Sequence, residues 1–315
     1  GTGAAAIGNS LVLVDEDKIT YAGEARTVPE GYEIYNISGK TIMPGLIDAH
    51  LHFSGNLTDN DTDWPTEDNL QKAVVAVQQA HECLEAGLTT VGEVSLFGIH
   101  IRNMIEQKVM KGPRVVASGR GFCATCSHGD SHKVSIERNL EGHPWGECVD
   151  SPWDLRKAVR RRLRENPDAI KIWATGGGIW RWETAMDQHY TMEEVQAVVD
   201  ECKMRHVPVW SHCFGSAANS VKAGVDLIIH GQSLDDETLD LMAEKGIALC
   251  PTINFMPAWL TTFPPKYDPA LHDQYPGETV AEKDLNRIYA NLKKARDRGI
   301  LLTTGSDSFN SQMTP

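Results

Sequence analysis

The sequence predicts an α/β protein in which a parallel (β/α)₈ barrel follows a small β unit. Two observations support this fold class. Beyond Pro44, short apolar runs typical of buried strands alternate with segments whose apolar residues recur at helical spacing, and eight such runs can be counted. In addition, 315 residues with 41% apolar content can bury one core of barrel size and a smaller piece. Strands that alternate with helices become parallel neighbours, and eight of them suggest a closed TIM barrel.

The N-terminal segment, residues 1–43, has a different pattern. It contains short alternating runs separated by turn residues, which predict a β-sandwich-like unit with strands near 10–14, 18–23, 33–36 and 41–43. The chain opens on Gly1 without a Met and stops at Pro315, directly after an apolar strand and an acidic turn. We therefore expect further sequence at both ends, and we expect the small unit to be incomplete without it.

The barrel is expected to span residues 44–315. Apolar stripes at helical spacing, such as Leu70, Val74, Val77 and residues 80–84, predict helices that pack on the core. Two connections, at about 120–152 and about 251–282, are too long for plain turns and are expected to shape or cover a binding site. The eight strands are expected near 46–52, 88–94, 113–119, 169–175, 207–212, 225–230, 247–250 and 300–306.

Composition excludes several classes of protein. A formal net charge of −13 argues against a nucleic-acid partner. No stretch approaches the roughly 20 apolar residues of a membrane helix, so no membrane partner is expected and a cytoplasmic location is the default. Seven cysteines, an odd number spread thinly, fit reduced thiols better than a disulfide framework. A small-molecule substrate is the expected partner, and assembly into a homo-oligomer is left open.

The strongest sign of chemistry is the pair His50 and His52, which closes the apolar run that begins at Thr41. Because a strand repeats every two residues, both imidazoles leave the same face and can bind one metal ion. Taken alone, the pair could equally be two half-buried histidines. Its position at a strand end favours the metal site, because a parallel barrel presents its active-site groups there.

Lys171 lies between two isoleucines in the fourth predicted strand. An unpaired lysine at such a position would lose its hydration, which depresses its pKa and makes the neutral amine accessible. A neutral amine can react with carbon dioxide to form a carbamate, and the two oxygens of a carbamate can each ligate a cation. The alternative is a lysine whose stem packs while its head reaches solvent.

Three further strands end in a titratable group: His212, His230 and Asp307. Each histidine alone could be a core residue, and Asp307 alone could be a turn-former. Together with His50 and His52 they provide nitrogen and oxygen ligands suited to zinc or another divalent transition metal. Asp307 could also take a proton from a metal-activated water.

These segments resemble the amidohydrolase superfamily. The resemblance rests on residues 44–52, 170–172, His212, residues 225–231 and residues 305–307, which span nearly the whole barrel. It implies two divalent metal ions, most simply Zn²⁺. His50, His52 and Asp307 would hold the more buried ion, His212 and His230 would hold the second, and a carboxylated Lys171 would bridge the two. A metal-bridging hydroxide would attack an amide carbonyl, with Asp307 as general base and then general acid.

Residues 118–129 and the run after Lys171 are similar to the Xaa-Pro dipeptidase (prolidase-like) and imidazolonepropionase-related branch of this superfamily. In that branch the histidine matching His128 is expected to help hold substrate. The chain carries Gly92-Glu93 where the branch usually has Arg-Asp, which weakens the inference of dipeptide specificity. Aromatic walls and a carboxylate clamp could come from other loop residues, among them Arg120, Trp180, Arg181, Trp182 and the 255–275 segment with Trp259.

Three readings of function follow. The first is a binuclear hydrolase of a small amide, such as a dipeptide or an N-acyl amino acid. The second is a mononuclear relative, a cyclic-amide hydrolase or deaminase, in which Lys171 is not a ligand. The third, a non-catalytic barrel scaffold, is disfavoured because no member of the six-residue set is missing. Separately, Cys123 and Cys126 with nearby histidines and Cys148 could form a structural zinc site, although the ligand spacing is irregular.

Overall fold

The structure of the chain is a computed structural model, which describes residues 4–58, 63–137, 139, 143–178, 180, 182–253 and 280–309. Contacts between Cα atoms divide the chain into two compact units, Gly1–Gly45 and Leu46–Pro315. Within the described residues no helix is both long and apolar enough to span a membrane.

The first unit contains one antiparallel pair of strands, β1 (Ser10–Asp15) and β2 (Lys18–Glu24). The strands predicted at 33–36 and 41–43 are wrong, because both segments are irregular. A strand needs a neighbouring backbone to pair with, and neither segment has one among the described residues. Their apolar side chains accordingly stay in solvent, as Tyr35 shows with 76% of its surface exposed.

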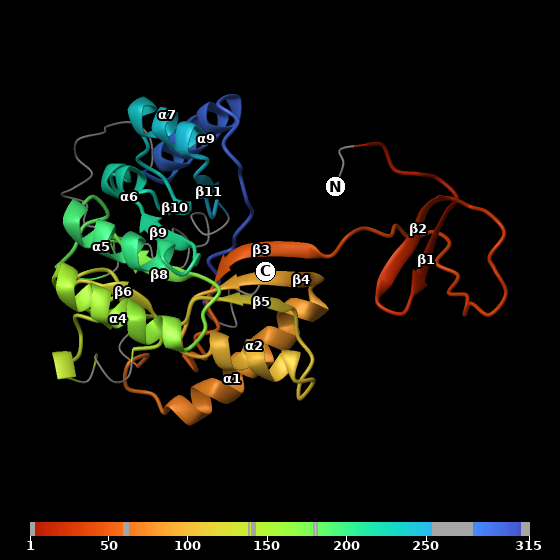
Figure 1. Ribbon diagram of the computed structural model, residues 1–315, viewed down its shortest axis with the longest axis horizontal. Coiled ribbons are helices and arrows are strands. Elements are labelled where there is room, and N and C mark those ends of the chain that lie inside the picture. The colour runs from red at the N-terminus through yellow and green to blue at the C-terminus, as the bar shows by residue number, and fades with distance from the viewer. Residues whose placement is uncertain are drawn as a thin grey trace. The chain divides into compact units, whose positions relative to one another are not determined.

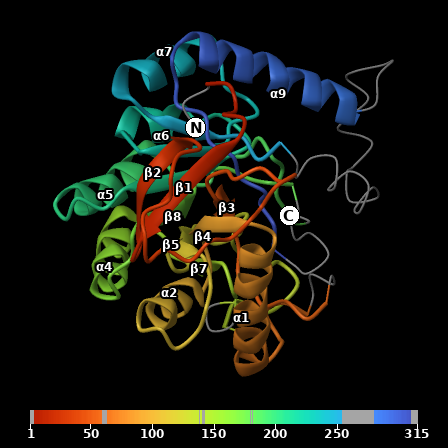
Figure 2. The ribbon, with the colours of Figure 1, turned by 90° about the vertical axis from the view of Figure 1, so that its right-hand side faces the viewer.

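The second unit is built on parallel strands that lie inside a layer of helices (Figure 1 and Figure 2). One sheet has the order β3-β4-β5 and the other the order β11-β10-β9-β8-β6-β7. The barrel strands match the first seven predicted ones closely: β3 (Leu46–Leu51), β4 (Leu88–Glu93), β5 (Arg114–Ala117), β8 (Ile170–Trp173), β9 (Val209–Cys213), β10 (Leu227–His230) and β11 (Ala248–Cys250). Two short strands within the long 120–152 connection were not predicted: β6 (Gly121–Cys123) and β7 (Gly146–Cys148).

Single backbone contacts continue the ring where the two sheets meet. The eighth predicted strand, 300–306, forms one parallel bridge, from Leu302 to Leu249 of β11. On its other side the Thr304 carbonyl accepts a hydrogen bond from the Ala49 amide of β3 at 2.7 Å. Between β5 and β8, the Asp168 amide donates to the Ala117 carbonyl at 2.8 Å. The predicted (β/α)₈ arrangement is therefore present, with joins made by individual bonds instead of long ladders.

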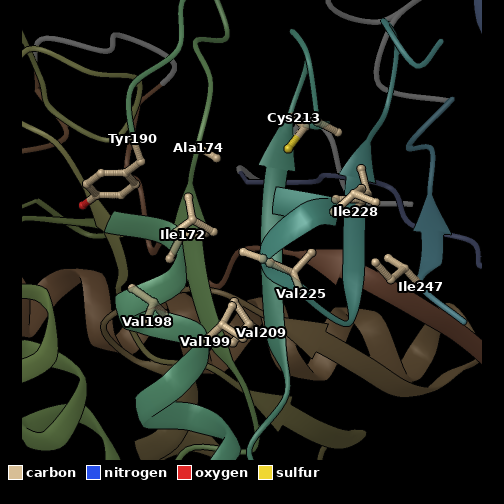
Figure 3. Packing of buried hydrophobic residues seen from close by; sticks show 14 of the residues in the cluster. Ile172, Ala174, Tyr190, Val198, Val199, Val209, Cys213, Val225, Ile228 and Ile247 are labelled. Atoms are coloured by element: carbon tan, nitrogen blue, oxygen red, sulfur yellow. The ribbon is translucent and has the colours of Figure 1, made fainter. Parts of the chain in front are cut away.

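The helices cover the outside of these strands (Figure 2). They are α1 (Asn69–Glu85), α2 (Gly98–Glu106), α4 (Pro152–Arg164), α5 (Met192–Lys203), α6 (Ala218–Ala223), α7 (Asp236–Lys245) and α9 (Val280–Asp297). Between α5 and the strands, Val198 and Val199 pack near Val209 of β9 and Ile172 of β8 (Figure 3). Burial of such aliphatic side chains, at about 25 cal/mol per Å² of apolar area, is the main term that holds the helix layer on the barrel.

The apolar stripe of α1 corrects one expectation. Leu70 and Val74 were expected in the core, yet they are 75% and 72% exposed. Ala80, which the stripe included, is buried, and Val77 packs against the core. The rest of the buried face of α1 includes small or polar residues such as Ala76 and Gln79. Small side chains let the helix approach the barrel closely, so its packed face is offset from the stripe that hydrophobicity alone selects.

Glu93, the last residue of β4, is a fully buried carboxyl group that contacts the segment following β3. Its Oε1 accepts a hydrogen bond from the Phe53 amide at 2.9 Å. Gly98, the first residue of α2, cannot carry a side chain in this arrangement, because a Cβ would lie 1.5 Å from Glu93 Oε2. Burial raises the pKa of Glu93 to about 7.

We expect Glu93→Gln to flatten the pH dependence of stability on the acidic side of neutrality. The folded-state pKa lies above the ordinary value of 4.5, so folding favours the protonated carboxyl and stability is lost as pH rises from about 4.5 through about 7. A glutamine has the same shape and does not ionise. Urea unfolding at about pH 5 and about pH 8 measures the difference, with the exposed Glu85→Gln as control. Equal pH dependence in Glu93→Gln and the wild type would contradict the assignment.

Candidate metal centre

The ends of the barrel strands bring six buried polar residues to one region. Each is at most 8% exposed: His50, His52, Lys171, His212, His230 and Asp307. His50 belongs to β3, Lys171 to β8, His212 to β9 and His230 to β10, while His52 follows β3 and Asp307 follows the eighth predicted strand. Among the described residues, one set of three His, Cys, Asp or Glu side chains could share an ion: His50, His230 and Asp307, whose ligand atoms lie within 4.8 Å of one another.

Asp307 is the carboxylate at the middle of this set. Its Oδ1 lies 3.1 Å from His50 Nε2 and 3.2 Å from His52 Nε2. Its Oδ2 lies 4.0 Å from His230 Nε2. Burial by itself would raise the pKa of Asp307, but the neighbouring imidazoles of His50 and His52 hold it well below the ordinary value. The residue is therefore an ionised carboxylate surrounded by imidazole nitrogens, a donor set that suits a divalent cation.

His212 and His230 form a second pair beside Asp307. His212 Nδ1 lies 3.0 Å from His230 Nε2. The ring of Phe214 stacks on His230 with centroids 4.1 Å apart, which closes one side of the pair to water. Burial lowers the pKa of both histidines well below the ordinary value, so both rings are neutral and can act as ligands.

Contacts outside the set determine which nitrogen of each ring points inward. The carbonyl of Val94 can only accept, so His52 Nδ1 donates to it at 2.6 Å and leaves the lone pair of Nε2 toward Asp307. The Gly176 carbonyl likewise accepts from His212 Nε2 at 3.2 Å, which leaves Nδ1 toward His230. Metal-binding histidines are commonly oriented in this way.

Lys171 provides the test of whether a metal centre fits here. Its side chain is fully buried, and its Nζ has no hydrogen-bond partner within the described part of the chain. Burial lowers the pKa of Lys171 to about 7, so the neutral amine is accessible near neutral pH. Its charge contributes to the lowered pKa of His50, after the larger effect of burial, so the amine is near the other candidate ligands. A buried amine without a partner is costly unless it is modified or engaged by a ligand, and a carbamate bound to cations would remove that cost.

Comparison with known proteins agrees with this geometry. Residues 41–314 match the amidohydrolase family. The chain belongs to the amidohydrolase family. Ochratoxinase from Aspergillus niger is 27% identical over 274 residues, a match that covers 81% of this chain and 57% of the relative. The chain thus spans little more than half the length of that curated relative.

Two solved structures resemble the amidohydrolase barrel described above. A Xaa-Pro dipeptidase with methionine bound in its active site is 26% identical, with a TM-score of 0.76 over 94% of this chain and 74% of the other. A prolidase complexed with N-methylphosphonate-L-proline is 23% identical, with a TM-score of 0.82 over 96% of this chain and 74% of the other. The second likeness supports the fold only.

The backbone of this amidohydrolase is strained at the centre. His230 and Asp307 have φ angles of 74° and 56°, in the left-handed region that residues other than glycine rarely adopt. Asp48, which the sequence did not single out, helps to hold this geometry. Its Oδ1 accepts from the amides of His50 at 3.0 Å and Ser306 at 3.1 Å, joining β3 to the segment that carries Asp307. A lone acid within an apolar strand was the available signal.

The residues predicted to contact substrate do not all lie close to the six candidate ligands. His128 stacks on His212, with ring centroids 4.6 Å apart, so it lies beside the candidate metal ligands. Trp180 is buried and donates from Nε1 to the His128 carbonyl at 2.8 Å, so it supports the His128 loop. Arg120 Nη2 lies 3.9 Å from Glu147 Oε2 in an ion pair. Arg181 and the 255–275 segment with Trp259 lie outside the described residues.

The alternative zinc site gains no support. Cys123 Sγ and Cys148 Sγ are 3.8 Å apart, and Cys126 is exposed. In the described ranges no third metal-binding atom completes a set with this cysteine pair. Burial raises the pKa of Cys123 well above its ordinary value, so its thiol stays protonated, unlike a thiolate ligand.

Proposed function

We propose that this chain is the catalytic barrel of a metal-dependent hydrolase that cleaves an amide C–N bond in a small substrate. The observation that carries the proposal is the buried amine of Lys171, which has no hydrogen-bond partner in the described part of the chain. Its charge acts on three histidines and on the ionised Asp307: the histidines are His50, His212 and His230. Structural lysines are rarely left in this state, because an unpaired buried amine costs several kcal/mol. A reactive or ligating role accounts for the cost.

Two divalent cations, most simply Zn²⁺, fit these residues. His50, His52 and Asp307 would hold one, His212 and His230 the other, and a carbamate on Lys171 would bridge them. The carbamate forms when neutral Nζ attacks carbon dioxide, making an N–C bond and releasing one proton. Bound here, the two ions would supply Lewis acidity for a carbonyl and would lower the pKa of a water molecule.

The protein's own residues would move the proton and hold the substrate. Asp307 lies where it can accept a proton as the amide carbonyl is attacked and return it to the leaving amine, so one carboxylate serves as base and then as acid. His128, stacked on His212, is placed to contact the substrate. Phe214 stacks on His230, and Trp145 contacts both His52 and Trp64, so these apolar rings would limit the access of water to the centre.

A dipeptide or an N-acyl amino acid is the substrate class we favour. The support is the likeness to a protein named as a Xaa-Pro dipeptidase, whose structure holds an amino acid in its active site. The relative named ochratoxinase makes an ochratoxin a further candidate substrate to include in a screen. The runner-up, a mononuclear cyclic-amide hydrolase or deaminase, needs only one metal and no modified lysine.

Metal analysis and a substrate panel test the proposal together. We expect about two Zn²⁺ per chain by mass spectrometry of the metal-loaded protein, and turnover of at least one member of a panel of dipeptides and N-acyl amino acids. A content near one ion per chain, with turnover only of cyclic amides or aminated bases, would favour the runner-up. Loaded protein that hydrolyses no amide would contradict the proposed function.

A further inference from the structure

A buried carboxylate lies behind His128, and nothing in the sequence pattern pointed to it. The Glu183 side chain is completely buried in the loop that follows β8. Its Oε1 lies 2.8 Å from His128 Nδ1, and its Oε2 accepts from the Gly177 amide at 3.1 Å. His189 Nε2 is a further 3.8 Å neighbour of Oε2. The Trp180 amide is a weaker donor to Oε1, at 3.4 Å. Glu183 therefore receives a ring N–H and two backbone N–H groups, and it lies close to a second imidazole.

This contact determines the state of the His128 ring. An ionised carboxylate only accepts, so Nδ1 of His128 must carry a proton. Within the described residues Nε2 of the same ring has no hydrogen-bond partner, while the ring face lies 4.6 Å from that of His212 at an angle of 27°. One nitrogen is thus occupied by Glu183, and the other is available beside a candidate metal ligand.

The surrounding loop leaves the ring little freedom. A Cβ on Gly177 would lie 2.0 Å from His128 Cε1, so residue 177 must be glycine for the ring to occupy this position. The backbone of His128 is held as well, because its carbonyl accepts from Trp180 Nε1 at 2.8 Å. These contacts hold His128 in place, but among the described residues only Glu183 forms a hydrogen bond with a nitrogen of its ring.

A purely structural role explains Glu183 less well. Uncharged contacts, such as the hydrogen bond from Trp180 to the His128 carbonyl, already hold the loop. An apolar side chain could fill the volume of Glu183 without the cost of burying a carboxylate. The contact between Glu183 and His128 instead sets the tautomer and orientation of a ring that stacks on the candidate ligand His212. Carboxylates that orient a catalytic or metal-bound histidine in this way affect activity strongly without touching the substrate.

We propose that Glu183 is a positioning residue, which holds His128 as an Nδ1-protonated ring and directs its Nε2 toward the substrate. This inference rests on the proposed function, since it assumes that a substrate binds beside His212. It assigns Glu183 no contact with the reacting atoms.

The kinetic test is a double-mutant cycle on the metal-loaded full chain. We expect Glu183→Gln to lower kcat/KM about 10- to 100-fold while the metal content stays at the wild-type value. In a His128→Gln background the same change should have no further effect, because its target is gone. The matched control is Glu201→Gln, which removes another buried carboxylate, paired with Arg156 and Arg160 on the outer layer, and should leave kcat/KM within about twofold.

Equal losses from Glu183→Gln with and without His128 would overturn the proposal, since Glu183 would then act through the loop fold. A second measurement does not depend on activity. Long-range ¹H–¹⁵N correlation of the metal-free wild type, with His128 assigned from His128→Gln, should show a protonated Nδ1. An Nδ1 without a proton would overturn the proposal, whereas absence of amide turnover with a protonated Nδ1 would count against the proposed function alone.

Discussion

Asp307→Asn is expected to lower kcat/KM about 10³-fold or more toward any amide that the protein hydrolyses. The amide side chain keeps the shape of the aspartate, but it is neither an anionic ligand nor a base. Asp307 touches His50, His52 and His230, so its charge is shared by both parts of the candidate centre. Steady-state kinetics with saturating Zn²⁺ measures the loss, and far-UV circular dichroism checks the fold.

Asp240→Asn serves as the control for this variant. Asp240 also forms a short ion pair, in which its Oδ1 lies 2.6 Å from Arg298 Nε, but it belongs to α7 in the outer layer. We expect its kinetics to match the wild type. An Asp307→Asn protein that retains a tenth or more of the wild-type kcat/KM would show that another group moves the proton.

Lys171→Met is expected to have opposite effects on metal binding and on stability. Methionine fills the same space but cannot form a carbamate, so the metal content should fall from about two ions to one or none per chain, with activity lost. In the metal-free protein the same change removes a buried amine that has no hydrogen-bond partner in the described part of the chain. It should therefore raise the free energy of unfolding by roughly 1–4 kcal/mol. Mass spectrometry and urea unfolding measure the two effects.

Lys72 supplies a matched control, because it is the other fully buried lysine in the described part of the chain. Its Nζ, unlike that of Lys171, donates to the Trp64 carbonyl. Lys72→Met leaves that carbonyl without its donor, so it should destabilise the protein and leave the metal content unchanged. Lys171→Met with full metal content and activity would rule out the bridging role.

Much of the barrel was predictable from local patterns. Apolar runs bounded by turn residues located the barrel strands to within a few residues, since a buried parallel strand needs β-branched and aliphatic side chains on both faces. The strands predicted at 33–36 and 41–43 were wrong because, among the described residues, neither segment has a neighbouring strand to pair with. A strand-like sequence forms a strand only where a second backbone is available, and sequence spacing does not report that availability.

His50 and His52 could be placed on one face from the two-residue period of a strand, and the parallel barrel brought His212, His230 and Asp307 to the same region as the sequence predicted. The burial of Lys171 between isoleucines was likewise readable from its neighbours. The hydrogen-bond partner of His128 could not be predicted from the sequence. Glu183 follows it by 55 residues, on a different loop with no periodic pattern, so only the tertiary structure could bring the two side chains together. Local spacing determines which residues share a strand face, whereas contacts between loops depend on how the whole chain closes around the barrel.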